Sequence, residues 1–139
     1  MECKVKWTGD GMSFLAETGS NHAVMMDGAP EAGGRNQAPR PMEMVLVGTG
    51  GCSAFDVVMI LKKGRHAISG CEVSLKAERA ETDPKIFTHI HFHFRVSGKG
   101  LKPEAVARAI DLSKNKFCSA SIMLGKTAEI THDFEIIED

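Results

Sequence analysis

The sequence predicts an α+β fold in which antiparallel sheets pack around one long central helix. Three observations carry this prediction. Several short segments alternate apolar and polar residues, which is the pattern of a half-buried strand. Short turns join most of these segments, and strands joined in this way pair antiparallel. Between them lies an apolar stretch over residues 41–63, which is long enough for about six turns of helix.

The N-terminal part predicts three strands in succession. Residues 2–8 alternate in polarity, and Gly9-Asp10-Gly11 is typical of a tight turn. Residues 12–17 then form the returning strand. A second turn at residues 18–21 leads to a third strand over residues 22–27.

Residues 28–41 predict a loop, because glycines and prolines recur through it. The loop carries two arginines, Arg35 and Arg40. A helix should follow from Pro41 to Lys63, since proline suits the first turn of a helix and Glu43 suits its positive N-terminal end. Glycines in the middle of this helix indicate the close approach of another backbone.

Residues 44–61 of this helix are apolar enough to be mistaken for a membrane span. They contain a single charge, Asp56, and a charge at mid-membrane costs ~2.5 kcal/mol or more. A helix that is apolar all round is also typical of a compact core. We therefore interpret this segment as the core helix and expect no membrane partner.

The C-terminal part predicts a hairpin, a helix and a final strand. Residues 71–81 and 86–96 alternate in polarity and flank a short turn. Residues 103–117 have apolar residues at helical spacing after a proline start. Residues 128–137 alternate again and predict the last strand.

Composition limits both the organisation and the function. The chain has 139 residues, so we expect a single domain over residues 1–139. Its 17 basic and 18 acidic residues give a net charge of −1, which argues against binding to nucleic acid or to an anionic membrane surface. The N-terminal residues lack the apolar stretch of a signal peptide, so a cytoplasmic protein is expected.

The four cysteines are Cys3, Cys52, Cys71 and Cys118, and none lies in a C-x-x-C pair. In a reducing cytosol we expect free thiols or a catalytic pair rather than structural disulfides. Cys3 and Cys71 lack a helix terminus or a basic neighbour, so we interpret both as structural. For Cys52 and Cys118 the alternative is burial as small hydrophobic residues. Asp56 follows Cys52 by one turn and would oppose a thiolate if it faced the sulfur, whereas an arginine from the preceding loop would favour one.

Three histidines, His89, His91 and His93, alternate with apolar residues on the strand over residues 86–96. They share one face and span ~13 Å at the usual strand rise, which is too far for one ion. We interpret this face as a polar, partly solvated side of a sheet, and metal binding there is the alternative. No metal and no cofactor are otherwise expected.

Two stretches resemble the OsmC/Ohr family, the osmotically inducible protein C and organic hydroperoxide resistance proteins. Pro41-Met-Glu-Met-Val-Leu-Val-Gly-Thr-Gly-Gly-Cys52-Ser-Ala-Phe-Asp-Val-Val-Met-Ile-Leu-Lys-Lys63 is similar to the family's helix with the first cysteine. Ala109-Ile-Asp-Leu-Ser-Lys-Asn-Lys-Phe-Cys118-Ser is similar to the helix end with the second. The strand order also fits, so the resemblance covers nearly the whole chain and points to the OsmC-like branch.

The resemblance implies an intertwined homodimer whose active sites are built at the subunit interface. It also implies thiol-dependent reduction of organic hydroperoxides. In that chemistry Cys52 attacks the peroxide as a thiolate, and the resulting sulfenic acid condenses with Cys118 to a disulfide. A dithiol reductant then restores the pair.

The resemblance further implies an arginine that stabilises the thiolate and a glutamate that orients this arginine. Arg35 and Arg40 are the candidates for the arginine, and Arg35 is favoured. Glu43 is the candidate glutamate, one residue after the position in the peroxidases, where this chain has Met42. Ser119 follows the second cysteine where many members have proline, and an OsmC-like branch shares the serine.

Two functions therefore stand side by side. The first is a cytoplasmic peroxidase that acts through Cys52 and Cys118. The second is a non-catalytic OsmC-like protein that binds an apolar small molecule at the dimer interface. Methionines near the loop could line such a pocket, because Met side chains adapt to irregular ligands. They are Met25, Met26, Met42 and Met44.

Overall fold

Two three-stranded sheets and one long helix confirm the predicted α+β class. The structure is a computed structural model that describes residues 1–139. It contains two compact units, Met1–Val47 and Gly48–Asp139. The boundary between them falls within helix α1 (Pro41–Lys63), which has the bounds expected from the sequence. The single-domain organisation stays a prediction.

The N-terminal unit contains a meander of β1 (Cys3–Trp7), β2 (Phe14–Thr18) and β3 (Ala23–Met26). Each strand pairs antiparallel with the next, as the short turns predict. The first turn needs backbone conformations that favour glycine, because Gly9 has φ 88° and Gly11 has φ 53°. The meander therefore follows directly from local turn chemistry.

One buried carboxylate organises the loop between β3 and α1. Asp27 accepts hydrogen bonds from the backbone N–H groups of Gly28 at 2.7 Å and Gln37 at 3.2 Å. A longer bond of 3.4 Å comes from the N–H of Arg35. These bonds hold the pKa of Asp27 below its usual value, and the bond from Gly28 has the largest effect. The loop thus has a defined course despite its glycines and prolines.

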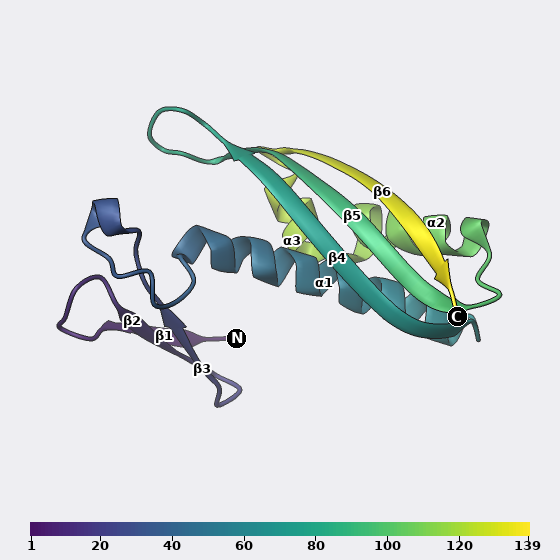
Figure 1. Cartoon of the computed structure of the whole chain (residues 1–139), viewed down its shortest axis with the longest axis horizontal. Helices are drawn as coiled ribbons and strands as arrows, with labels where there is room; N and C mark the ends of the chain where they lie inside the picture. Colours follow the sequence, from purple (N-terminus) through teal and green to yellow (C-terminus); the bar gives the residue numbers. More distant parts are fainter. The chain divides into compact units, whose positions relative to one another are not determined.

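The C-terminal unit contains the larger sheet, with the order β4-β5-β6 (Figure 1). β4 (Ala67–Arg79) and β5 (Phe87–Lys99) form the expected antiparallel hairpin. β4 begins four residues before the predicted strand. β6 (Glu129–Glu138) is the last strand and takes the free edge of β5.

The pairing of β6 differs from the expectation, because β6 runs parallel to β5. Parallel neighbours need a long crossover connection rather than a turn. Here the crossover consists of α2 (Pro103–Leu112), a π-helical turn η2 (Ser113–Phe117) and α3 (Ser119–Leu124). These helices carry the chain back to the end of the sheet where β5 began.

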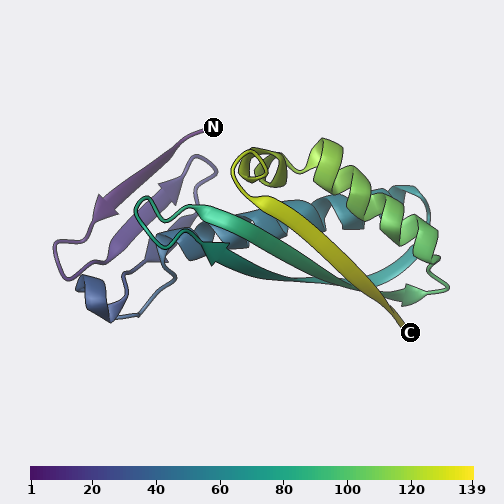
Figure 2. The same ribbon diagram turned by 90° about the horizontal axis from the view of Figure 1, so that it is seen from above.

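The core of this unit lies between the sheet and the helices. α1, α2 and α3 lie on one face of the β4-β5-β6 sheet (Figure 2). The side chains of β5 on that face are at most 2% exposed; they are Ile90, Phe92, Phe94 and Val96. α2 faces them with buried Val106, Ala109 and Ile110 at helical spacing. This arrangement confirms the alternation predicted for β5.

Helix α1 packs closely on the sheet at one glycine. A Cβ added to Gly50 would lie 2.7 Å from Cδ1 of Leu75 on β4, whereas one added to Gly51 would meet nothing within 4 Å. The predicted close approach of another backbone is therefore wrong: Gly50 faces a leucine side chain, and a Cβ at Gly48 or Gly51 would meet nothing within 4 Å. By length and composition α1 could cross a membrane, with mean hydropathy 1.9 in a window that is 33% buried. Its buried face, however, carries polar Ser53 and charged Asp56, which suits a core helix.

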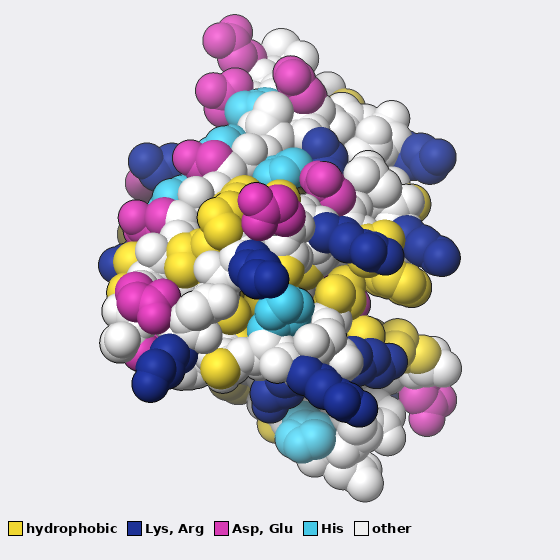
Figure 3. Space-filling model, turned by 90° about the vertical axis from the view of Figure 1, so that its right-hand side faces the viewer, with side chains coloured by type: hydrophobic (Ala, Val, Ile, Leu, Met, Phe, Trp, Pro, Cys, Tyr) yellow, Lys and Arg dark blue, Asp and Glu magenta, His cyan; other side chains and the backbone are white.

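The surface carries both signs of charge. On the face shown in Figure 3, basic, acidic and histidine side chains all occur. This mixture is what the net charge of −1 implies.

Candidate functional site

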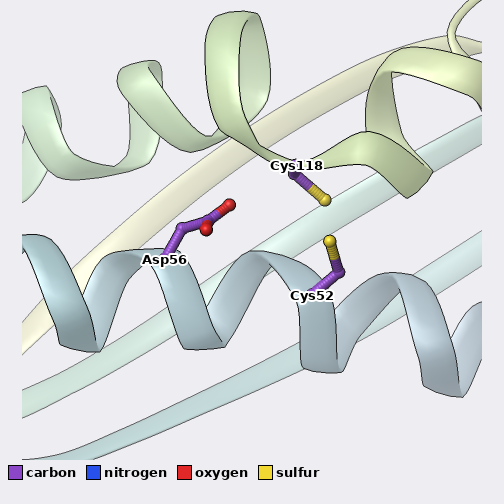
Figure 4. Close-up of side chains that lie close together, drawn as sticks. All are labelled: Cys52, Asp56 and Cys118. Atoms are coloured by element: carbon purple, nitrogen blue, oxygen red, sulfur yellow. The ribbon is translucent and has the colours of Figure 1, made fainter.

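Two cysteines and one carboxylate meet between α1 and the crossover helices (Figure 4). The Sγ atoms of Cys52 and Cys118 and a carboxylate oxygen of Asp56 all lie within 4.8 Å of one another. Cys52 and Asp56 share a face of α1 because residues four apart on a helix lie one above the other. Cys118 comes from the opposite side and is fully buried. The site therefore joins segments that are more than sixty residues apart in sequence.

The π-helical turn η2 brings Cys118 to this position. The N–H of Cys118 donates to the carbonyl of Ser113 at 2.8 Å, a bond between residues five apart. Such a turn is wider than an α-helical one and is often found at functional sites. The predicted helix over residues 103–117 is thus α-helical only to Leu112. Because of the wider turn, Ser113 and Cys118 both face α1.

Asp56 points toward the sulfur atoms, which settles the orientation that the sequence left open. The Ser113 hydroxyl donates to its Oδ2 at 2.9 Å. A hydroxyl has a single proton, so in the 3.1 Å contact between the two serines Ser53 is the donor and Ser113 the acceptor. Within the C-terminal unit no basic side chain forms an ion pair with Asp56. The side-chain donor to this buried carboxyl group is therefore the Ser113 hydroxyl.

Cys118 is fully buried in the core beside the polar side chain of Ser121. Ser121 donates twice to its sulfur, from the hydroxyl at 3.0 Å and from the backbone N–H at 3.4 Å. Burial raises the pKa of the Cys118 thiol, and the neighbouring Cys52 adds to this, while both Ser121 bonds lower it. Burial is the largest of these influences. Cys118 is therefore held mainly as a neutral thiol at neutral pH.

A small cavity lies in the core of this unit, and Ser121, which donates to the Cys118 sulfur, forms part of its wall. Its volume is about 10 Å³, and its polar wall is formed by Ser53, Ser121, Lys114 and His132. Burial lowers the pKa of His132, and the nearby Lys114 lowers it further. Its Nδ1 atom is buried without a hydrogen-bond partner, and its Nε2 lies 3.6 Å from the carboxylate of Asp111. His132 is thus kept neutral beside the site.

The predicted arginine and glutamate belong to the N-terminal unit. Arg35 forms a bidentate ion pair with Asp10, with N···O distances of 2.5 and 2.8 Å. Glu43 accepts a hydrogen bond from the backbone N–H of Arg40 at 2.9 Å, which caps the start of α1. Glu43 therefore contacts the backbone of an arginine rather than a guanidinium. The two cysteines both belong to the other unit.

The other two cysteines differ in burial. Cys71 is partly buried on β4, and burial raises the pKa of its thiol. This fits the structural role expected for it. Cys3 is exposed on β1.

The histidine strand forms a ladder of polar contacts on the outer face of the sheet. Thr131 bonds to His89 at 3.0 Å and to His91 at 2.7 Å. Asp133 bonds to His91 at 3.0 Å and to His93 at 2.8 Å, and it raises the pKa of His93. β6 thus supplies a carboxylate that the local sequence lacks. The side chains of His91 and His93 are 36% and 37% exposed, which matches the expected polar, partly solvated face.

Sequence reasoning missed two serines of the site, Ser113 and Ser121. Ser113 had a signal, because it occupies the apolar stripe of the helix over residues 103–117. A hydroxyl in such a stripe needs a buried partner, and Asp56 is that partner. Ser121 follows Cys118 by three residues at the start of α3, which is the usual spacing for a capping contact.

The fold and the site together define a class: α+β proteins in which a long helix and a crossover segment hold two cysteines side by side. The family model for OsmC-like protein matches residues 34–133. This chain therefore belongs to the OsmC-like family, as the two cysteine-containing stretches indicated. Proteins of this family are soluble, so α1 is a core helix.

Individual proteins are similar to this chain over nearly its whole length. The chain is 51% identical to Protein YhfA of Escherichia coli (strain K12) over 137 residues, which cover 99% of this chain and 98% of that protein. A hypothetical protein from Aquifex aeolicus VF5 has 27% identity and a TM-score of 0.86, covering 99% of this chain and 96% of that one. The organic hydroperoxide resistance protein OsmC from Legionella pneumophila shares the fold at 12% identity, with a TM-score of 0.71 and coverage of 96% and 95%.

Proposed function

We propose that this protein is a thiol-dependent peroxidase that reduces organic hydroperoxides. One observation carries the proposal: the sulfur atoms of Cys52 and Cys118 lie within 4.8 Å of each other in a mostly buried site. Disulfide formation requires both side chains to rotate until the sulfurs are ~2.05 Å apart. Membership of the family that includes hydroperoxide resistance proteins supports the same chemistry.

The two cysteines divide the reaction between them. Cys52 is the more accessible and attacks the peroxide as a thiolate, which breaks the O–O bond and forms a sulfenic acid; the alkoxide takes up a proton and leaves as an alcohol. The Cys118 sulfur then attacks the sulfenic sulfur, and water leaves as the disulfide forms. A dithiol reductant supplies the two electrons and two protons that restore both thiols. Burial of Cys118 suits this second role, because a neutral thiol does not compete for the peroxide.

Arg35 is the proposed partner of the thiolate, and Glu43 is the residue proposed to orient it. Arg35 and Asp10 are both exposed, so their pair is weak enough to exchange for another anion. The guanidinium remains charged at any physiological pH. Arg35→Ala should therefore slow the reaction of Cys52 with peroxide, whereas Arg40→Ala should not.

The working form is proposed to be a cytoplasmic homodimer. Large apolar side chains are exposed in both units, among them Trp7 at 58%, Val47 at 61% and Phe55 at 68%. On α1, Phe55 lies with Val58 and Met59 along one hollow, and a contiguous apolar patch of this kind is typical of a surface that a second copy covers. Sedimentation analysis of the wild type and of Phe55→Glu tests this, since the charged variant should shift toward monomer. A wild-type chain that sediments as a monomer at all concentrations would contradict the dimer.

A second candidate function is binding of an apolar small molecule without catalysis. An open hollow of about 500 Å³ runs along the exposed side of α1, with Phe55, Val58 and Met59 in its wall. Its lining differs from the methionines expected near the loop. The hollow is large enough for a small ligand.

The deciding experiment is a stoichiometric reaction of the reduced protein with cumene hydroperoxide, followed by intact-mass measurement and peptide mapping. We expect the loss of two hydrogens and a Cys52–Cys118 link. The Cys71→Ser variant is the matched control and should react in the same way. Unchanged thiols, together with a tightly retained apolar ligand in the native mass spectrum, would refute the peroxidase and favour the binding protein.

A further inference from the structure

The cysteine pair has a feature that peroxide chemistry alone does not need, the carboxylate of Asp56. It lies within 4.8 Å of both sulfurs and is only 7% exposed. A negative charge at this place repels a thiolate on either cysteine. In the C-terminal unit no basic side chain pairs with it. If all three groups are anionic, they therefore repel one another unless a cation binds between them.

These three groups are a ligand set for zinc. Thiolate sulfur and carboxylate oxygen are both common zinc ligands, and a tetrahedral site places its ligand atoms roughly 3.5–3.8 Å apart. The upper limit of 4.8 Å between the atoms of Cys52, Asp56 and Cys118 is close to this spacing. The two ligands on α1 are four residues apart, which is the spacing that places two ligands on one helix face.

The groups around the ligands support them. Ser113 donates to Oδ2 of Asp56 at 2.9 Å, and Ser121 donates twice to the sulfur of Cys118. Hydrogen bonds of this kind orient metal ligands and tune their basicity. Ser121 bonds also stabilise a thiolate, which is the form that binds metal. The histidine ladder offers no such arrangement, because its carboxylate already bridges His91 and His93.

We propose that the reduced protein binds one Zn²⁺ ion through Cys52, Asp56 and Cys118. Two thiolates and one carboxylate compensate the charge of the ion, and binding releases the two thiol protons. Three protein ligands leave the fourth position of a tetrahedral site to water or to a small ligand. Zinc converts the repulsion between Asp56 and the sulfurs into a shared attraction to one cation.

Zinc binding and disulfide formation exclude each other, which makes the site a redox-controlled metal site. This consequence rests on the proposed function for its oxidant, an organic hydroperoxide. The hydroperoxide takes two electrons from the two bound thiolates and two protons from solvent, and its O–O bond breaks to give an alcohol and water. The S–S bond forms as both Zn–S bonds break, and Zn²⁺ is released.

Cobalt tests the site without reference to catalysis. Untagged, reduced protein is titrated with Co²⁺ under argon, and Zn²⁺ is then added. We expect one equivalent of Co²⁺ to produce the intense visible bands of tetrahedral thiolate ligation, and Zn²⁺ to abolish them. Cys52→Ser and Asp56→Asn should each weaken binding at least about tenfold. Cys71→Ser and His91→Asn are the matched controls and should bind as the wild type does.

Several results would overturn the proposal. One is the absence of cobalt–thiolate bands while a thiol assay shows both cysteines free. Another is binding that survives Cys52→Ser or that is lost in His91→Asn. Circular dichroism establishes that each variant is folded, and Cys52 is only partly buried, so its serine variant is expected to fold.

The same samples separate this proposal from the proposed function. A disulfide that forms with cumene hydroperoxide in protein that does not bind Co²⁺ would refute the metal site and leave the peroxidase. Metal binding in a protein whose metal-free thiols ignore the hydroperoxide would refute the peroxidase and leave the metal site.

Discussion

The hydroxyl of Ser121 should control how readily the buried Cys118 ionises. Ser121→Ala removes the 3.0 Å hydrogen bond to the sulfur and leaves the weaker backbone bond at 3.4 Å. A hydrogen bond to a charged group contributes ~1.5–3 kcal/mol, and sulfur is a weak acceptor, so the lower end of this range applies. Because about 1.4 kcal/mol corresponds to a factor of ten, the thiolate fraction at a given pH should fall roughly tenfold. The loss of a donor thus raises the pKa of Cys118 further.

The measurement uses a background in which Cys118 is the remaining thiol, made by replacing the other three cysteines with serine. Ultraviolet absorbance of the thiolate is followed against pH, because this signal does not require a reagent to reach a buried sulfur. Ser119→Ala is the matched control, since Ser119 is exposed and makes no bond to the sulfur. An unchanged or larger thiolate fraction in Ser121→Ala would refute the reasoning. Ser121→Thr keeps a hydroxyl and should restore the wild-type behaviour.

Three further predictions concern stability. Ser113→Ala removes the donor to the buried carboxylate on α1 and should lower the free energy of unfolding by ~1–3 kcal/mol in urea titrations; Ser53→Ala keeps that bond and should cost less. Gly51→Ala should stabilise the helix by about 1 kcal/mol, whereas Gly50→Ala should gain less or destabilise, because its Cβ meets a leucine on β4; equal thermal midpoints would contradict the close packing. Burial lowers the pKa of His132 in the folded protein. As the pH falls below the unfolded value of 6.5, the unfolded chain therefore binds more protons than the native protein, and the free energy of unfolding decreases. His132→Phe should flatten this acid dependence of the melting temperature, and an unchanged slope would disprove it.

Local patterns predicted most of the elements but not every pairing. The alternation of β5 and the glycine turns of the meander act over a few residues, so they can be read from the chain. The direction of β6 depends on where the crossover ends, and alternation is the same for both directions. The prediction of an antiparallel partner therefore failed for that strand alone.

For the site, too, the local contacts could be predicted from the sequence and the long-range ones could not. Helical spacing placed Asp56 and Cys52 on one face, but the approach of Cys118 depends on a π-helical turn. No propensity marks such a turn, because it differs from an α-helical turn only in that its hydrogen bond spans five residues instead of four. The carboxylate that joins the histidine ladder comes from Asp133, whose partners are 42 and 40 residues away in the sequence. Contacts of this range arise from the tertiary fold.

The parallel pairing of β6 also sets the order in which the protein can be assembled during synthesis. The β4-β5 hairpin needs only neighbouring residues, whereas β6 must wait until the whole crossover has been translated. Cys118 lies inside that crossover, so a nascent chain carries Cys52 long before its partner is fixed beside it. A chain that ends before β6 keeps every cysteine but lacks the strand that anchors the crossover. The close pair of thiols is therefore a property of the full-length chain. A stop codon between Cys118 and β6 would prevent the pair from forming, although all four cysteines would still be present.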